Sequence, residues 1–430
     1  MRWILSTGIF FFNSAIQHSA LLSEHMRVLV LNSGSSSLKF RVLNITPATN
    51  GRAANHRVLA GGAVTGIGGL STFRLDGNSD QTAAERPVKD HGEAVEWIFS
   101  HLDTRQIGAV GHRVVHGGER FGGPVRLTDA VLAEIEQLSD LAPLHNPACL
   151  AAIRGAREHL PDDTPMVAVF DTSFHATMPT IASTYAIPNE LAARHGIRRY
   201  GFHGIAHQSL MNGYAALTGR DLSNARLITL HLGNGCSAAA IRGGRSVDTS
   251  MGLTPLEGLV MGTRSGDLDP AIVAYLARRE RVDAQTIERW LNEKSGLLGV
   301  TGLSNDMRKL LEAEAEGNHR AALAIDLFCY RARKYIGAYL AVLEGADAVV
   351  FGGGIGEHSP VVRERICAGM EWCGLKLDRE QNRKAVNLVT DQAARISPKD
   401  AAVPAFVVAV DEETAIADET VQCLENSAEL

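Results

Sequence analysis

The sequence lacks the patterns of several large protein classes. It has six cysteines in 430 residues and no Cys-x-x-Cys pair, which argues against a zinc ribbon, a redox dithiol or a secreted disulfide framework. Its net charge is −6, so it has no basic field to hold nucleic acid or an anionic membrane. We therefore predict a cytoplasmic protein with reduced thiols that has neither a nucleic-acid nor a membrane partner.

Long hydrophobic runs are also missing. The apolar patch at residues 9–12 is too short to cross a bilayer, and a strand-like pattern begins directly after Met26. We interpret residues 1–25 as a dispensable N-terminal extension, with a targeting signal as the alternative. The length of the chain allows two or three domains, each with its own core.

Two strand–turn–strand patterns with similar sequences lie about half a chain apart. The first has its turn at residues 32–37, and the second lies within residues 227–241. This similarity indicates a duplicated domain. Asn32 aligns with His231 and Gly34 with Gly233, and Ser37 falls near Ser237.

A third glycine-rich turn follows a strand-like run at residues 348–357. It is neither a Walker A loop nor a Gly-x-Gly-x-x-Gly turn, but such turns at strand ends can present backbone N–H groups to phosphate oxygens. Helical spacing predicts helices over residues 129–140 and 321–343. Strands that alternate with helices imply an α/β fold.

The loop at residues 247–270 has the composition of a binding loop. It interleaves Gly, Thr, Ser and Pro with carboxylates and Arg264. Because Arg264 lies between Gly262 and Gly266, its guanidinium can approach a ligand closely. The alternative interpretation is a solvated surface loop.

Arg113 and several histidines are further candidates for binding an anion. Arg113 follows an apolar run, so we expect it at a strand end, where it suits bidentate capture of a carboxylate or phosphate; the alternative is an ion pair with a protein carboxylate such as Glu119. The histidines lack zinc-site spacing, and those in turns indicate a site that stabilises negative charge. The turn histidines are His145, His175 and His203, whereas we interpret His116 and His207 as structural.

These segments together resemble the acetate kinase (acetokinase) family, within the acetate and sugar kinase, heat-shock chaperone and actin superfamily. The resemblance runs from about Met26 to Thr420. It rests on Asn-Ser-Gly-Ser-Ser-Ser-Leu-Lys-Phe, Gly-His-Arg-Val-Val-His-Gly-Gly-Glu, Pro-Leu-His-Asn-Pro, Phe-Asp-Thr-Ser-Phe-His, Tyr-Gly-Phe-His-Gly, His-Leu-Gly-Asn-Gly, Met-Gly-Thr-Arg-Ser-Gly-Asp-Leu-Asp-Pro and Gly-Gly-Gly-Ile-Gly-Glu.

The resemblance implies an α/β fold with two duplicated actin-like (ribonuclease H-like) domains and an active-site cleft between them. The first domain would comprise residues 26–175 plus 414–430. The second, residues 176–413, would bind the nucleotide and form a homodimer.

The resemblance also implies reversible, Mg²⁺-dependent phosphoryl transfer from ATP to acetate, with Mn²⁺ as an alternative metal. The catalytic residues would be Asp171, His203 and Arg264, and Asn32 and Glu412 would hold the metal. Acetate would be bound by Arg113, Val115, Leu144, Phe202 and Pro255. The nucleotide would contact Lys39, His231, Leu232, Gly233, Asn234, Gly235, Asp306, Met307, Arg308, Gly354, Ile355, Gly356, Glu357 and His358, and His145 and His175 are second-line active-site residues.

Some alternatives stay open at this point. The family assigns Asp171 as a proton donor or acceptor, but acetate is already ionised at pH 7, so the alternative role for Asp171 is to order Mg²⁺ or the arginines. The acid substrate could be propionate or butyrate, although Val115 favours acetate. A non-enzymatic actin-like ATP-binding module and a sugar or glycerol kinase are the rival classes.

Overall fold

The computed structural model describes residues 25–46, 55–76, 84–143, 145–389 and 392–428. The extension predicted for residues 1–25 therefore lies outside the described residues, apart from His25. Within the described ranges, no helix is long and apolar enough to cross a membrane. All six cysteines are free thiols, and the cytoplasmic location stays a prediction.

The first sheet combines an antiparallel hairpin with two further buried strands that run parallel to the first strand of the hairpin. Its strands are β1 (Met26–Ser33), β2 (Ser37–Thr46), β3 (Asn55–Thr65), β4 (Gly69–Leu75), β5 (Ala84–Val88), β6 (Ala109–Val114), β7 (Val125–Arg126) and β8 (Met166–Phe170), in the order β5-β4-β3-β2-β1-β6-β8-β7. Strands β1, β6 and β8 run parallel, whereas β2 and β3 are antiparallel to their neighbours. The parallel strands read as apolar runs because both of their faces are covered.

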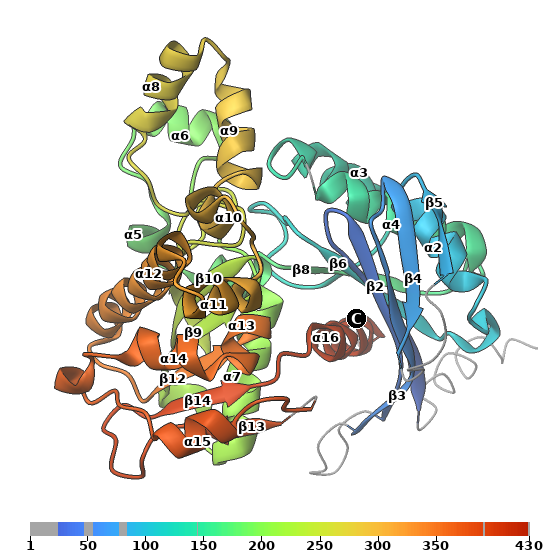
Figure 1. Cartoon of the computed structure of the whole chain (residues 1–430). Coiled ribbons are helices and arrows are strands. Elements are labelled where there is room, and N and C mark those ends of the chain that lie inside the picture. Colours follow the sequence, from blue (N-terminus) through green and yellow to red (C-terminus); the bar gives the residue numbers. More distant parts are fainter. Residues whose placement is uncertain (1–24, 47–54, 77–83, 144, 390–391, 429–430) are drawn as a thin grey trace, which may run out of the picture.

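The second sheet repeats this connectivity. Its strands are β9 (Arg226–Leu232), β10 (Cys236–Arg242), β11 (Arg245–Thr249), β12 (Ala348–Gly352), β13 (Ala393–Arg395) and β14 (Ala405–Val408), in the order β11-β10-β9-β12-β14-β13. As in the first sheet, an antiparallel hairpin precedes two strands that run parallel to its first strand. The predicted α/β fold with a duplicated unit is confirmed, and Figure 1 shows the two halves side by side.

The strand registers refine the alignment of the two repeats. Asn32 lies beside Arg113 of β6, and His231 lies in the same way beside Gly352 of β12, so these two positions are equivalent, as predicted. Across the hairpins, however, Asn32 pairs with Lys39 and His231 pairs with Ser237. Ser237 therefore corresponds to Lys39, two residues after Ser37, because the first hairpin has one more residue in its turn.

Two helices exchange places between the halves. Helix α7 (Gly204–Thr218) follows β8 of the first sheet but packs on β9, β12 and β14 of the second. Helix α16 (Glu412–Ala428) follows β14 but packs on β1, β6 and β8, and it also touches α7. Figure 1 shows α16 between the two halves. The domain boundaries proposed from the sequence stay a prediction.

The remaining helices cover the outer faces and carry the loops of the site. Helices α2 (His91–Phe99) and α4 (Asn146–His159) pack on the first sheet, and α12 (His319–Leu343) packs on the second. The predicted helix over residues 129–140 is α3 (Asp129–Gln137) followed by a 3₁₀ turn, and the one over residues 321–343 is α12. The others are α5 (Thr180–Ser183), α6 (Asn189–His195), α8 (Ala271–Glu280), α9 (Ala284–Glu293), α10 (Gly296–Thr301), α11 (Met307–Ala315), α13 (Gly353–His358), α14 (Pro360–Cys367) and α15 (Arg379–Lys384).

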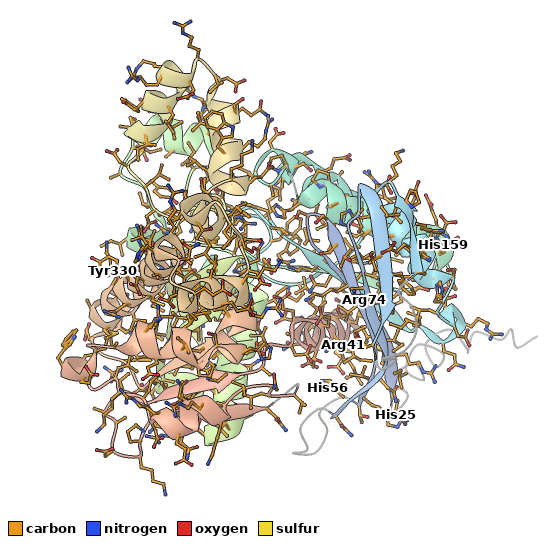
Figure 2. The ribbon with its side chains drawn as sticks, viewed as in Figure 1. His25, Arg41, His56, Arg74, His159 and Tyr330 are labelled. Atoms are coloured by element: carbon orange, nitrogen blue, oxygen red, sulfur yellow. The ribbon has the colours of Figure 1, made fainter. Side chains whose placement is uncertain are left out.

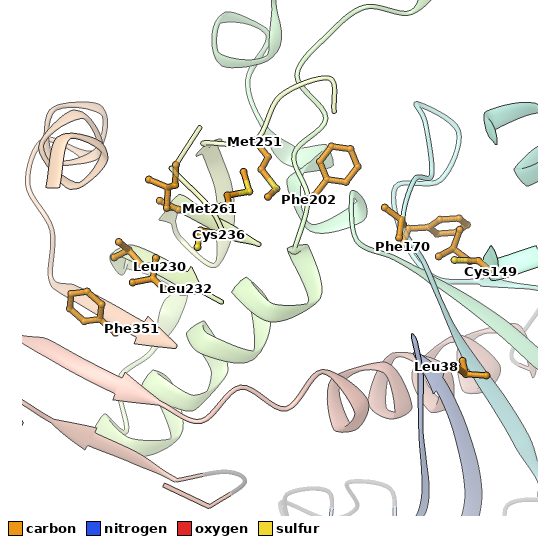
Figure 3. Packing of buried hydrophobic residues seen from close by; sticks show 14 of the residues in the cluster. Leu38, Cys149, Phe170, Phe202, Leu230, Leu232, Cys236, Met251, Met261 and Phe351 are labelled. Atoms are coloured by element: carbon orange, nitrogen blue, oxygen red, sulfur yellow. The ribbon is translucent and has the colours of Figure 1, made fainter. Parts of the chain in front are cut away.

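One hydrophobic cluster extends through both halves. Its labelled members run from Phe351 and Leu230 in the second sheet, through Phe202, to Phe170 at the end of β8 (Figure 3). Phe202 is 1% exposed and directly precedes His203. The core is therefore packed against the loop between α6 and α7, which carries His203.

Two ion pairs of Arg41 fix the N-terminus of α16 to the first sheet. Arg41 of β2 donates from Nη1 to both carboxylate oxygens of Asp411, at 2.6 and 2.7 Å, and its Nη2 lies 3.6 Å from Glu413. Figure 2 shows Arg41 close to this helix. Asp411 in turn accepts hydrogen bonds from the backbone N–H and the hydroxyl of Thr414. These contacts hold Glu412, the first residue of α16, near Asn32.

Candidate active site

A small cavity, which we call the cation cavity, lies where the strand ends of the first sheet face the second half. Its volume is about 200 Å³. Ligands commonly bind at the carboxyl ends of parallel strands in open α/β sheets, and β6 and β8 supply Arg113 and Asp171 here. The lining residues are Gly34, Ser35, Ser37, Arg113, Val115, His145, Asp171, Phe202, His203, Gly235, Pro255 and Arg264.

A larger cavity, of about 750 Å³, adjoins the second sheet. Gly233 and Asn234 line this large cavity, whereas Gly235 of the same turn lines the cation cavity. The turn between β9 and β10 therefore separates the two spaces. The lining residues of the large cavity are Gly233, Asn234, Asn305, Asp306, Met307, Arg308, Leu311, Gly354, Ile355, His358, Ser359 and Asn387.

Arg113 is paired with Asp171 at the floor of the cation cavity. Its Nε and Nη2 both donate to Oδ2 of Asp171, at 3.1 and 2.5 Å. Burial acts against the guanidinium charge, but the carboxylates of Asp171 and Glu412 hold the pKa of Arg113 above its ordinary value. The alternative interpretation, in which Arg113 pairs with a protein carboxylate, is therefore confirmed, with Asp171 as the partner and not Glu119, which pairs with Arg198.

Asp171 is almost fully buried, with 1% of its surface exposed. Burial raises the pKa of Asp171 above its ordinary value of 3.8, and the charge of Arg113 opposes that rise. The backbone carbonyl of Asp171 accepts the N–H of Gly204 at 2.9 Å. The start of α7 is therefore joined to the end of β8, beside the cation cavity.

The loop that holds Arg264 requires glycine at two positions. A Cβ at Gly262 would lie 2.0 Å from Oδ1 of Asn234, and one at Gly266 would lie 2.4 Å from the carbonyl of Leu259. Gly266 also has a φ of +68°, which favours glycine. The sequence-based interpretation of a solvated surface loop is therefore wrong for this segment, which packs closely against the turn that separates the two cavities.

The charge of Arg264 has no carboxylate partner within the described residues. Its Nη1 donates to the carbonyl of Pro255 at 3.1 Å. Burial lowers the pKa of Arg264 below its ordinary value, and the charge of Arg113 adds to this effect. A half-buried cation without a protein counter-ion is costly, so this geometry suits an anionic ligand.

His203 stands at the junction of the first half and α7 in an unusual backbone conformation. Its φ is +59°, in the left-handed region that non-glycine residues rarely adopt. Gly204 follows because a Cβ there would lie 2.2 Å from the carbonyl of Asp171. Burial holds the pKa of His203 well below 6.5, and the charge of Arg113 adds to this effect, so the ring is neutral near pH 7.

The other histidines divide into lining and supporting residues. His145 lines the cation cavity, and burial, with the charges of Arg264 and Arg113, lowers its pKa to about 4. His175 lines neither cavity. Its Nδ1 lies 2.8 Å from the hydroxyl of Ser246, and its Nε2 lies 3.1 Å from the carbonyl of Phe202. It supports the backbone just before His203.

The structure brings together many, but not all, of the residues predicted to bind the nucleotide. Glu357 is engaged elsewhere, since its Oε1 accepts the N–H groups of Gly353 and Val410 at 2.9 and 3.1 Å. Leu144, which was predicted to contact acetate and not the nucleotide, lies outside the described residues. Those lining the large cavity are Gly233, Asn234, Asp306, Met307, Arg308, Gly354, Ile355 and His358, and those not lining it are Lys39, His231, Leu232, Gly235, Gly356 and Glu357.

Sequence reasoning missed several lining residues. Asn305 donates to Oδ1 of Asn234 at 3.0 Å and could have been suspected from its place just before Asp306. Asn387 has a φ of +54° and comes from a distant loop, for which the sequence gives no signal. The other missed residues of the large cavity are Leu311 and Ser359.

The groups predicted to hold Mg²⁺ lie beside the cation cavity. Asn32 donates to Oε2 of Glu412 at 2.9 Å. Burial acts to raise the pKa of Glu412, but Arg113, His231, Asn32 and Lys39 together outweigh it, so the pKa lies below its ordinary value and the group is ionised. Within the described residues, no three His, Cys, Asp or Glu side chains form a metal cluster. One carboxylate and one amide oxygen still fit Mg²⁺, which takes its other ligands from water and phosphate.

The fold and site define an α/β protein of two repeated sheets, in which a large cavity adjoins a small one lined by two arginines and two histidines. The model of the acetokinase family matches residues 27–418, and the chain belongs to this family.

Individual relatives agree with this assignment over almost the whole chain. An acetate kinase of Solibacter usitatus is 47% identical over 93% of this chain and 98% of that protein, and one of Chloroherpeton thalassium is 44% identical over 93% and 99%. The crystal structure of Porphyromonas gingivalis acetate kinase matches with a TM-score of 0.84 and 41% identity over 93% and 100%. A propionate kinase from Francisella tularensis matches with a TM-score of 0.82 and 38% identity over 92% and 99%.

Proposed function

We propose that the chain is an acetate kinase, which transfers the γ-phosphoryl group of ATP to acetate reversibly and gives acetyl phosphate and ADP. One observation carries the proposal. Arg113, His203 and Arg264 surround a cavity of about 200 Å³ that meets the large cavity at a single turn. This arrangement suits a small carboxylate placed in line with the end of a nucleotide.

The roles follow from the chemistry of each group. ATP occupies the large cavity, and its terminal phosphate reaches the cation cavity past Gly235. Arg113 holds the carboxylate of acetate, because a guanidinium binds a carboxylate with two parallel hydrogen bonds. Apolar surface from Val115, Phe202 and Pro255 surrounds the methyl group.

Transfer is direct, with the carboxylate oxygen attacking the γ-phosphorus as the bond to ADP breaks. This reaction needs mainly alignment and stabilisation of charge on the equatorial oxygens. Arg264 and His203 supply this stabilisation from the second half. Asn32 and Glu412 would hold Mg²⁺, which neutralises phosphate charge when it is bound.

The experiment that tests this function traps the product with hydroxylamine. Purified protein is incubated with ATP and Mg²⁺ and with acetate, propionate or butyrate in parallel. We expect acetyl hydroxamate to form fastest. Hydroxamate mainly from a longer acid would retain the mechanism and change the substrate. Nucleotide binding without any hydroxamate would instead indicate a non-enzymatic actin-like module.

Propionate is the second candidate substrate, because the Francisella propionate kinase is similar to this chain over nearly its full length. The discriminating residue is Val115, which is 4% exposed and lines the cation cavity. Its two methyl groups occupy space that a longer acid needs.

Val115→Ala should therefore shift preference toward propionate. We expect the ratio of kcat/KM for propionate to that for acetate to rise about 10-fold, since one methylene in an apolar pocket is worth roughly 10–200-fold. The measurement is the hydroxamate assay with both acids at several concentrations. A variant with an unchanged ratio would show that Val115 does not limit the size of the acid.

We also propose a homodimer formed through the second half, residues 176–413. Ile181 of α5 is 91% exposed, and Leu323 and Tyr330 of α12 are 60% and 56% exposed. Leu323 and Tyr330 are seven residues apart, so they lie on one face of the helix, and Figure 2 shows Tyr330 at the outer side of α12. Light scattering should give twice the mass of one chain, and the mass of one chain would contradict the proposal.

A further inference from the structure

A chain of buried hydrogen bonds leads from His203 away from the cation cavity. The hydroxyl of Ser237 lies 2.9 Å from Nδ1 of His203 and 2.8 Å from Nε2 of His207. Nδ1 of His207 lies 2.8 Å from the hydroxyl of Thr229. Ser237, His207 and Thr229 are each 0% exposed, so water does not compete for these contacts.

The fold brings the four side chains together from three elements. His203 directly precedes α7, and its carbonyl accepts the N–H of His207 in the first turn of that helix at 2.9 Å. Thr229 and His231 are two residues apart in β9, so their side chains point to the same face of the sheet. Ser237 of β10 pairs with His231, so its side chain points to that face as well. Helix α7 packs on that side.

The number of available protons fixes the direction in which this series of hydrogen bonds is donated. Each hydroxyl has one proton to donate, and each neutral histidine has one N–H. Burial holds the pKa values of His203 and His207 well below 6.5, so both rings are neutral. In one direction, Thr229 donates to His207, His207 donates to Ser237, and Ser237 donates to Nδ1 of His203. The proton of His203 is then on Nε2.

The opposite direction leaves a donor without a partner. His203 would donate from Nδ1 to Ser237, Ser237 would donate to His207, and His207 would donate to Thr229. The hydroxyl proton of Thr229 would then have no acceptor, since within the described residues this hydroxyl has hydrogen-bond contact with His207 alone. An unsatisfied buried donor is unfavourable, so the first direction is the stable one.

We infer that Thr229, His207 and Ser237 are positioning residues that keep the proton of His203 on Nε2, where it donates to the phosphoryl group in transfer. His203 lines the cation cavity, and its Nε2 lies 3.4 Å from where a Cβ of Gly235 would be, on the side of the turn between the two cavities. A neutral Nε2–H stabilises an equatorial oxygen, whereas a bare Nε2 would repel it. The inference rests on the proposed phosphoryl transfer.

The tautomer can be measured without turnover. The full chain is labelled with ¹⁵N-histidine, the signals of His203 are identified by their loss in His203→Gln, and long-range ¹H–¹⁵N correlations report each ring nitrogen. We expect a pyrrole-like shift at Nε2 and a pyridine-like shift at Nδ1. Thr229→Val should give a mixture of tautomers, and the matched variant Thr229→Ser should not. A proton on Nδ1 in the wild type, or no change in Thr229→Val, would overturn the inference.

Kinetics provide the second readout. Ser237→Ala should lower kcat by roughly 10–100-fold, as loss of a hydrogen bond that orients a functional histidine often does, with both KM values within about twofold. Ser237→Thr, which keeps the hydroxyl, should recover most of this loss. Thr229→Val, with its two tautomers about equally populated, should lower kcat only about twofold, and it carries the test if Ser237→Ala does not fold.

Failure of this inference and failure of the proposed function can be told apart. If the wild type forms no acyl hydroxamate, the phosphoryl transfer fails, while the tautomer measured in the free protein still supports or overturns the positioning. If the wild type is active and Ser237→Ala keeps its kcat, only the positioning fails.

Discussion

Replacing Arg264 with alanine should lower kcat by about 10³–10⁵-fold, the range expected when an arginine that stabilises a transferring phosphoryl group is removed. The KM values for ATP and acetate should change little, because the nucleotide and the carboxylate have their own contacts in the large cavity and at Arg113. Initial rates with both substrates varied measure these constants. A rise in KM with an unchanged kcat would contradict the proposed role.

The structure explains why this loss should be catalytic rather than structural. Arg264 has no carboxylate partner within the described residues, and burial already lowers its pKa, so removing its charge relieves a desolvation cost. The folded state should therefore be at least as stable, which thermal unfolding of the variant can check. Arg264→Lys is the matched control: it keeps a charge but lacks the planar fork, and we expect it to recover only part of the rate.

Much of this site could be predicted from the sequence, because its residues lie in short motifs at strand ends. The turns after β1, β9 and β12 were recognisable from glycine next to apolar runs, and Arg113 was expected at the end of a strand. The equivalence of Asn32 and His231 was also visible, and the strand registers bear it out. Local sequence carries this information because a tight turn restricts the residue types that can occupy it.

What the sequence did not reveal depends on contacts between distant segments. The resemblance placed residues 414–430 with the first half, and α16 packs there, but nothing in the sequence indicated that α7 packs on the second sheet. Asn387 lines the large cavity from a loop far from every motif. His207 was interpreted as structural, and its link to His203 through Ser237 became visible only when β10 was placed against α7.

Asp171→Asn is the second variant for which we expect a large effect. Asparagine keeps the shape of the side chain but removes the charge that Arg113 faces, and breaking a buried charge pair costs about 3–5 kcal/mol. Because acetate is already ionised near pH 7, it needs no base. We therefore expect the loss mainly in kcat/KM for acetate, by at least about 100-fold, through a displaced Arg113.

The pH dependence separates this role from general acid–base catalysis. Burial raises the pKa of Asp171 above 3.8, so kcat/KM of the wild type, calculated for the acetate anion, should fall as the pH drops through that raised value and Asp171 becomes protonated. Protonation breaks the pair with Arg113 in the same way as the substitution does. Asp171→Asn should thus have a low kcat/KM without this acidic limb.

The remaining kcat of Asp171→Asn decides between the two roles. If Asp171 only orients Arg113, saturating acetate should restore much of the rate, because the transition state still meets Arg264 and His203. If Asp171 transfers a proton in the rate-limiting step, kcat should stay low at every acetate concentration. The first result is the one that the geometry favours, since both donors that reach Oδ2 belong to Arg113.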